Sequence, residues 1–117
     1  MDRESAEQFA TEWITGWNAH DLESILSHYS DDFEMSSPVI TQVTGNPDGV
    51  LKGKQAVGEY WAKALKLFPN LKFTHICTLL GMNSVVIHYY GATGKRVAEV
   101  FTFNDAGLVC KAHAHYE

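Results

Sequence analysis

Apolar residues in the first half of the chain recur at steps of three and four, which is the spacing of one helix face. This pattern predicts a helix from about Arg3 to Ala19, a short second helix capped by Asp21, and a third helix from Lys54 to just before Pro69. The apolar faces of the three helices hold Ala6, Phe9, Ala10, Trp13 and Trp17, then Leu22, Ile25, Leu26 and Tyr29, then Val57, Tyr60, Trp61, Ala64, Leu65 and Phe68.

The segment between the second and third helices follows neither helical period. Phe33–Ser37 predicts a short strand. Pro38–Gly53 contains two prolines and three glycines, so we expect a loop. A loop of this length is long enough to act as a lid over a pocket, and a plain surface loop is the alternative.

The second half of the chain is rich in Val, Ile, Thr, Phe and Tyr and is punctuated by Gly and Asn turns, which is typical of strands. Four strands are expected, at Leu71–Leu80, Ser84–Tyr90, Arg96–Asn104 and Leu108–Tyr116. Helices followed by hairpin-connected strands predict an α+β fold, with three helices packed in the concave face of a curved, mainly antiparallel sheet. The space that such a sheet leaves beside the helices is a candidate pocket.

Composition narrows the class of protein. The 117 residues fit a single domain spanning 1–117, and the formal net charge of −5 argues against nucleic acid as a partner. No apolar run approaches the roughly 18 residues of a membrane span, so no membrane partner is expected. Cys77 and Cys110 lie inside apolar runs, which favours reduced, buried thiols and a cytoplasmic location.

Several segments resemble one superfamily, the nuclear transport factor 2-like proteins, and within it the SnoaL-like polyketide cyclases and the ketosteroid isomerases. The segments are Trp17–Glu23, Tyr29–Phe33, Leu51–Lys54 and the closing Phe101–Gly107 hairpin. The resemblance implies a cone-shaped, cystatin-like roll with a mixed sheet. It leaves the activity open, since this scaffold serves isomerases, dehydratases, hydrolases, cyclases and non-catalytic binding modules.

The isomerase pattern transfers to this chain only in part. The resemblance places the general base at Ser37, whose hydroxyl is too weak a base to take a proton from carbon unaided. It places the oxyanion-hole Tyr at Trp13, a supporting Tyr at Trp61 and the buried acid at Glu99. Ketosteroid isomerisation itself is therefore not expected.

Glu99 is the strongest candidate for chemistry. Strand alternation puts it on one face with Val97, Phe101 and Phe103. An acid among inward-facing apolar residues loses hydration, which raises its pKa and suits it to exchange protons near neutrality. The alternatives are a position on the convex face and a salt bridge at a dimer contact.

His88 is the second candidate, and its role depends on one loop. If Gly91–Gly94 form a four-residue turn, Glu99 pairs with Val86 on the neighbouring strand. His88 then lies one step along the strand on the same face as Glu99, which predicts that Glu99 and His88 form an acid–base pair. One residue more or less in that turn sends His88 to the other face, where it would be an ordinary sheet histidine.

His113 and His115 form an H-x-H pair on the last predicted strand. The resemblance implies that their neighbours Ala112, Ala114 and Tyr116 face the pocket. Both histidines are therefore expected on the convex face of the sheet. No third ligand stands at a fixed spacing, and no metal is predicted.

The predicted pocket is lined mainly by large rings from the helices, and ordinary core packing is the alternative for these residues. The expected lining is Trp13, Trp17, Tyr29, Met35, Ser37, Trp61, Leu65, Phe101, Ala112, Ala114 and Tyr116. Such a wall suits a flat, apolar ring compound.

Two functions remain open. The first is a cofactor-free isomerase, cyclase or lyase acting on a small apolar carbonyl-bearing ring, with Glu99 as acid–base and His88 or Trp13 polarising the oxygen. The second is a non-catalytic module that binds a small apolar ligand or a partner chain. A homodimer through the convex face of the sheet is expected in either case.

Overall fold

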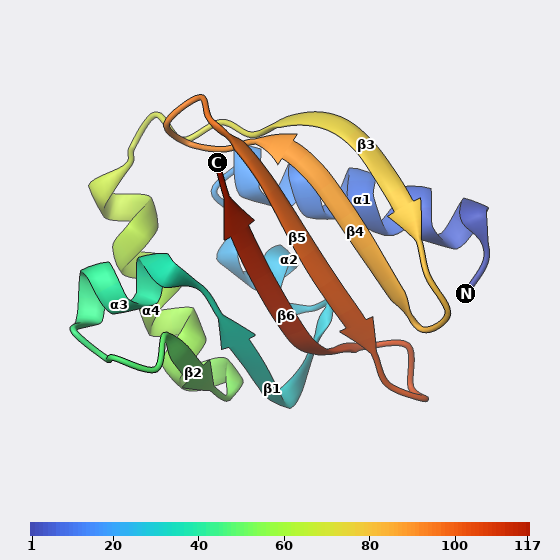
Figure 1. Cartoon of the computed structure of the whole chain (residues 1–117), viewed down its shortest axis with the longest axis horizontal. Coiled ribbons are helices and arrows are strands. Elements are labelled where there is room, and N and C mark those ends of the chain that lie inside the picture. The colour runs from blue at the N-terminus through green and yellow to red at the C-terminus, as the bar shows by residue number, and fades with distance from the viewer.

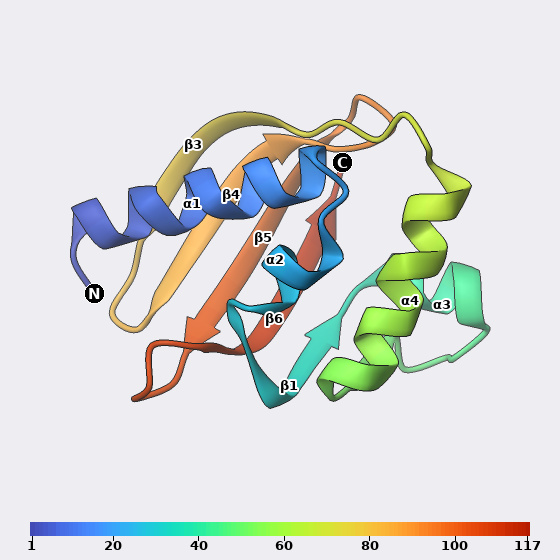
Figure 2. The same cartoon turned by 180° about the vertical axis from the view of Figure 1, so that it is seen from behind.

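A single curved sheet of six strands carries the fold, and helices cover one of its faces (Figures 1 and 2). The computed structural model describes residues 1–117. The strand order is β2-β1-β6-β5-β4-β3, with β1 parallel to β6 and every other neighbouring pair antiparallel. The elements are α1 (Arg3–Asn18), α2 (Leu22–Leu26), β1 (Tyr29–Ser36), α3 (Pro38–Thr44), β2 (Val50–Lys52), α4 (Lys54–Leu67), β3 (Thr74–Leu80), β4 (Ser84–Tyr90), β5 (Arg96–Phe103) and β6 (Val109–Tyr116). The predicted α+β class and mixed curved sheet are confirmed.

The two long helices follow the predicted periodicity. Asp2 caps α1 by accepting a hydrogen bond from the Ser5 N–H, and Asp21 caps α2 in the same way through Ser24. Figure 2 shows α1 and α2 lying across the concave face, with α4 at its side. The apolar faces of α1 and α4 turn toward the sheet because the opposite faces are polar.

The prediction of a loop over Pro38–Gly53 is wrong, because α3 and β2 lie within this segment. Ser37 caps a seven-residue helix, α3, by accepting a hydrogen bond from the Val39 N–H, and Pro38 occupies the first helical position. A proline there costs little, because the N–H that it lacks has no partner in the first turn. Gly45 then ends α3 in the left-handed conformation, with φ of 77°.

The strand boundaries also differ from the prediction, by three residues or more at the starts of β1 and β3. Tyr29, expected on the second helix, begins β1, and its backbone pairs with Val109 of β6. Strand β3 begins at Thr74 rather than Leu71. Just before it, the Asn18 side chain bonds both the N–H and the C=O of Phe73, at 2.7 and 2.9 Å, and so replaces a strand partner there.

The register between β4 and β5 is one residue away from the predicted one. The turn has five residues, closed by a 2.8 Å hydrogen bond from the Gly91 N–H to the Lys95 carbonyl, so Tyr90 pairs with Arg96. Glu99 therefore pairs with Ile87 rather than Val86. His88 lies opposite Ala98, on the other face of the sheet from Glu99. The predicted pairing of His88 with Glu99 is wrong.

The core fills the space between α1, α2, α4 and the concave face. Its fully buried members include Trp13, Tyr29, Phe33 and Phe101. The convex face has no helix over it (Figure 1). None of the helices has the length and apolar character needed to cross a membrane.

Candidate functional site

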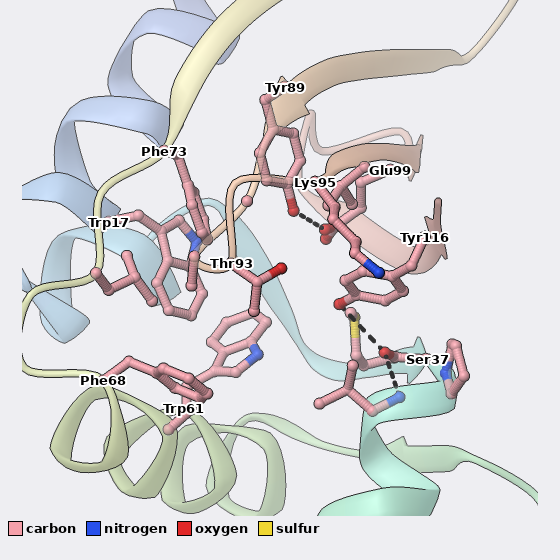
Figure 3. A pocket seen from close by; sticks show the side chains of 18 of the residues that line it. Trp17, Ser37, Trp61, Phe68, Phe73, Tyr89, Thr93, Lys95, Glu99 and Tyr116 are labelled. Atoms are coloured by element: carbon pink, nitrogen blue, oxygen red, sulfur yellow. Dashed lines mark hydrogen bonds between the residues drawn. The ribbon is translucent and has the colours of Figure 1, made fainter.

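A cavity of about 380 Å³ opens where α3, α4 and the β4–β5 turn meet the inner face of the sheet. Its walls come from distant parts of the chain: the end of α1, the segment after α4, and the ends of β5 and β6. In Figure 3, the rings of Trp17, Phe68 and Phe73 lie on one side, and Glu99, Tyr116 and Ser37 lie on the other. The pocket thus has an aromatic wall and a polar wall.

Glu99 is the buried acid of the polar wall. Only 3% of it is exposed, and no Lys, Arg or His pairs with it. Burial raises the pKa of Glu99 to about 7, and the hydrogen bond from Tyr89 offsets part of that rise. Near neutral pH the group therefore exists in both protonation states, which is what proton exchange with a ligand requires.

Tyr89 holds this acid in place. Its hydroxyl donates a 3.0 Å hydrogen bond to Glu99 Oε1, and both residues line the pocket (Figure 3). Burial, together with the nearby Glu99, raises the pKa of Tyr89 well above its usual value, so the phenol stays protonated. Glu99 Oε2 has no hydrogen-bond partner in the protein and is free to meet a ligand.

A second pair of hydroxyls lies beside this dyad. Ser37 Oγ donates a 3.4 Å hydrogen bond to the Tyr116 hydroxyl, and the same Oγ caps α3 (Figure 3). The Tyr116 O–H is left free to donate into the pocket. Ser37 occupies the position that the resemblance gives to a carboxylate base, so the site holds one inward carboxyl group rather than two.

The Trp13 indole is not available to a ligand oxygen. Its N–H donates a 2.9 Å hydrogen bond to the buried Tyr29 hydroxyl, and only 1% of the residue is exposed. The predicted polarising role of Trp13 is therefore wrong. Trp17 differs, because its N–H is buried without any acceptor among aromatic rings, with Trp61 at 5.2 Å and Phe73 at 5.4 Å between ring centroids.

About half of the residues expected at the site line the cavity. These are Trp13, Trp17, Met35, Ser37, Trp61, Glu99 and Tyr116. Tyr29, Phe101, Ala112 and Ala114 lie on the inner side but are sealed in the core, and Leu65 is half-buried on α4 beside the cavity. His88 is excluded by the register and contacts Cys77 Sγ at 3.9 Å on the convex side.

Sequence reasoning missed much of the lining. Tyr60, Ala64 and Phe68 share the predicted apolar face of α4 with Trp61, so the helical period alone could have found them. Tyr89 was hidden by the register error. No sequence signal indicated that the β4–β5 turn contributes Gly91, Ala92, Thr93 and Lys95.

The remaining histidines of the last strand point away from the cavity. His113 is half-buried and His115 exposed, while Ala112 and Ala114, which alternate with them, are buried on the inner side. His115 Nδ1 lies 3.2 Å from the Ala98 carbonyl oxygen. No group of three His, Cys, Asp or Glu side chains is placed to hold a metal ion.

The SnoaL-like domain matches residues 10–112, nearly the whole chain. The protein belongs to the SnoaL-like family. A SnoaL-like protein of unknown function from Burkholderia thailandensis is 54% identical, with 99% of this chain and 97% of that one covered and a TM-score of 0.97. No protein among the curated ones matches.

More distant SnoaL-like and related structures share the fold alone. A proposed isomerase of the SnoaL-like family from Agrobacterium tumefaciens is 14% identical over 96% of this chain and 97% of that one, with a TM-score of 0.76. A proposed hydroxylase from Streptomyces galilaeus is 18% identical over 99% and 91%, with a TM-score of 0.75. Different activities are thus described for one scaffold.

Proposed function

We propose that this SnoaL-like protein is a cofactor-free enzyme of the isomerase, cyclase or lyase type that moves a proton on a small apolar ring compound bearing a carbonyl group. One observation carries the proposal: Glu99, a carboxyl group with a pKa of about 7 and no cationic partner, opens into a cavity walled by aromatic rings. Burying such an acid is unfavourable for folding, and a protein that needed only a core would place an apolar residue there.

The ligand class follows from the two walls. Flat rings bind well against aromatic faces, which favours a ligand with a ring system on the side of Trp17, Phe68 and Phe73. The polar wall offers Glu99 Oε2 and the Tyr116 hydroxyl, which suit a single oxygen function at the other end of the ligand.

The proposed step is enolisation. The Glu99 carboxylate takes a proton from the carbon beside the carbonyl, and the C–H electron pair moves onto the oxygen to form an enolate. The same carboxyl group then returns the proton to another carbon or to the oxygen. Tyr89 keeps the carboxylate oriented through its 3.0 Å hydrogen bond, and the Tyr116 hydroxyl is a free donor on the same wall for the enolate oxygen. No electron is transferred, so the step needs no cofactor.

Hydrogen exchange tests this directly. With 1-tetralone in D2O, the wild-type protein should speed replacement of the hydrogens on the carbon next to the carbonyl, followed by NMR. Glu99→Gln should slow this exchange by about 100-fold or more, since the amide cannot accept the proton. His88→Ala is the matched control and should exchange at the wild-type rate, because His88 lies on the convex side.

The rival function is a binding module without catalysis, and the absence of a second carboxylate at Ser37 favours it. The same experiment separates the two. Calorimetric binding of 1-tetralone without accelerated exchange would establish the binding module and refute the enzyme. A protein that neither binds nor exchanges the ketone would refute both.

We also propose that the chain forms a homodimer through the convex face. Leu79, Val86, Val100 and His113 are paired in register across four strands, so they form one apolar row with a histidine at its end. Leu79 is 54% exposed and no helix covers the row (Figure 1). A second copy related by a two-fold axis would bury this row against itself.

Sedimentation velocity tests the dimer. The wild type should sediment as a dimer at micromolar concentration, and Val100→Lys should sediment as a monomer because two cations would meet at the centre of the interface. Gln55→Lys adds the same charge on the exposed surface of α4 and should remain dimeric. A monomeric wild type would refute the proposal.

A cytoplasmic location remains part of the proposal. Its support is that Cys77 and Cys110 are both free thiols, which is typical of a reducing compartment.

A further inference from the structure

Lys95 stands at the mouth of the pocket without a partner. It is exposed in the β4–β5 turn, it lines the cavity, and it takes part in none of the ion pairs or side-chain hydrogen bonds of the protein. Figure 3 shows its side chain on the same side of the pocket as Glu99 and Tyr116. Binding a neutral ring compound between the aromatic wall and the polar wall does not require a cation at this position.

Lys95 helps to lower the pKa of the acid beside it, Glu117, but the Glu117 carboxylate is already bonded to another cation. Glu117 also lines the mouth, but its carboxylate accepts hydrogen bonds from Arg96 at 2.8 Å to Nη2, 3.1 Å to Nε and 3.0 Å to the backbone N–H. Arg96 and Glu117 therefore form a closed pair with no net charge. Lys95 is then the one cationic side chain that lines the cavity.

We propose that Lys95 selects ligands that carry an anionic group, a carboxylate in the simplest case, at the end opposite the carbonyl. The inference rests on the proposed function, because it uses the same pocket and the same orientation toward Glu99. The carbonyl end meets the polar wall at Glu99, the ring body lies on the aromatic wall, and the carboxylate meets the Lys95 ammonium at the mouth.

Lys95 lies in the turn that leads into β5, four residues before Glu99. An aromatic wall alone would bind a neutral ring compound equally well. The unpaired ammonium is the feature that discriminates between a neutral and an anionic form.

Two matched probes test this selection by calorimetry at low salt: 1-tetralone-6-carboxylate and its neutral analogue 1-tetralone-6-carboxamide. The wild type should bind the carboxylate about fivefold more tightly. The preference should shrink as salt is raised to about 0.3 M, because the pair lies at the solvent edge. Lys95→Met keeps the apolar stem and should bind both probes equally, whereas Lys95→Arg should keep the preference.

Lys111→Met is the control, because it removes the same charge from the exposed outer side of β6. It should leave both affinities at the wild-type values. Equal binding of the two probes by the wild type, or a preference that survives Lys95→Met, would overturn the role of Lys95 and leave the proposed pocket standing. Failure of both probes to bind would overturn the proposed function and this inference together.

Discussion

Replacing Trp13 by alanine is expected to lower the free energy of unfolding by about 4 kcal/mol. The residue is 1% exposed, and its ring lies within 5.2–5.6 Å of the ring centroids of Phe73, Tyr89 and Phe101. Alanine would leave a cavity where the end of α1 meets the sheet, and the Tyr29 hydroxyl would lose its hydrogen-bond partner. Urea unfolding followed by circular dichroism measures the loss.

A pair of milder variants separates packing from the hydrogen bond. Trp13→Phe keeps most of the ring contacts but leaves the Tyr29 hydroxyl buried and unpaired, so we expect a loss of about 1–3 kcal/mol beyond the change in ring size. The double variant Trp13→Phe/Tyr29→Phe no longer has that hydroxyl. It should therefore recover most of the stability that Trp13→Phe loses through the unpaired hydroxyl. A Trp13→Ala variant within about 1 kcal/mol of the wild type would show that the ring is not part of the core.

The helical period and the strand composition were enough to predict the architecture. Trp13 and Trp17 follow the apolar face of α1, and Trp61 follows that of α4, so their burial could be read from the sequence. α3 was missed because the two prolines and three glycines of Pro38–Gly53 were interpreted together as a loop. A proline directly after Ser37 and seven residues before Gly45 is instead the start and stop pattern of a short helix.

The site was harder to predict because the side of a strand residue depends on turn length. The β4–β5 turn has five residues rather than four, and that one residue moved His88 out of the predicted site. The same shift brought Tyr89 to the inner side, where it bonds Glu99. One error therefore produced a false catalytic pair and concealed a true contact. Glu99 itself was correctly placed inward, because its alternation with Val97 and Phe101 lies within one strand.

Glu99→Gln is expected to raise the free energy of unfolding at pH 8 by about 3 kcal/mol over the wild type, with little difference near pH 4.5. The pKa of Glu99 is about 7 in the folded protein, whereas an unperturbed glutamate, as in the unfolded chain, has a pKa of 4.5. Between pH 4.5 and pH 7, Glu99 has lost its proton in the unfolded chain but still holds it in the folded protein. The free energy of unfolding of the wild type therefore falls as the pH rises through this range. Above pH 7 the folded protein holds a buried carboxylate, whereas the amide stays neutral throughout.

The comparison isolates Glu99 from the other titrating groups. Burial lowers the pKa of His28, so His28 makes stability fall as the pH drops below its ordinary value of 6.5, opposite to Glu99. This contribution is the same in both proteins and cancels in their difference. Tyr89→Phe supplies a second check, because the Tyr89 hydrogen bond lowers the pKa of Glu99 and its removal should move the wild-type transition to higher pH. A difference between wild type and Glu99→Gln that stays constant from pH 4.5 to 8 would mean that Glu99 does not titrate in this window, and the proposed proton transfer would lose its basis.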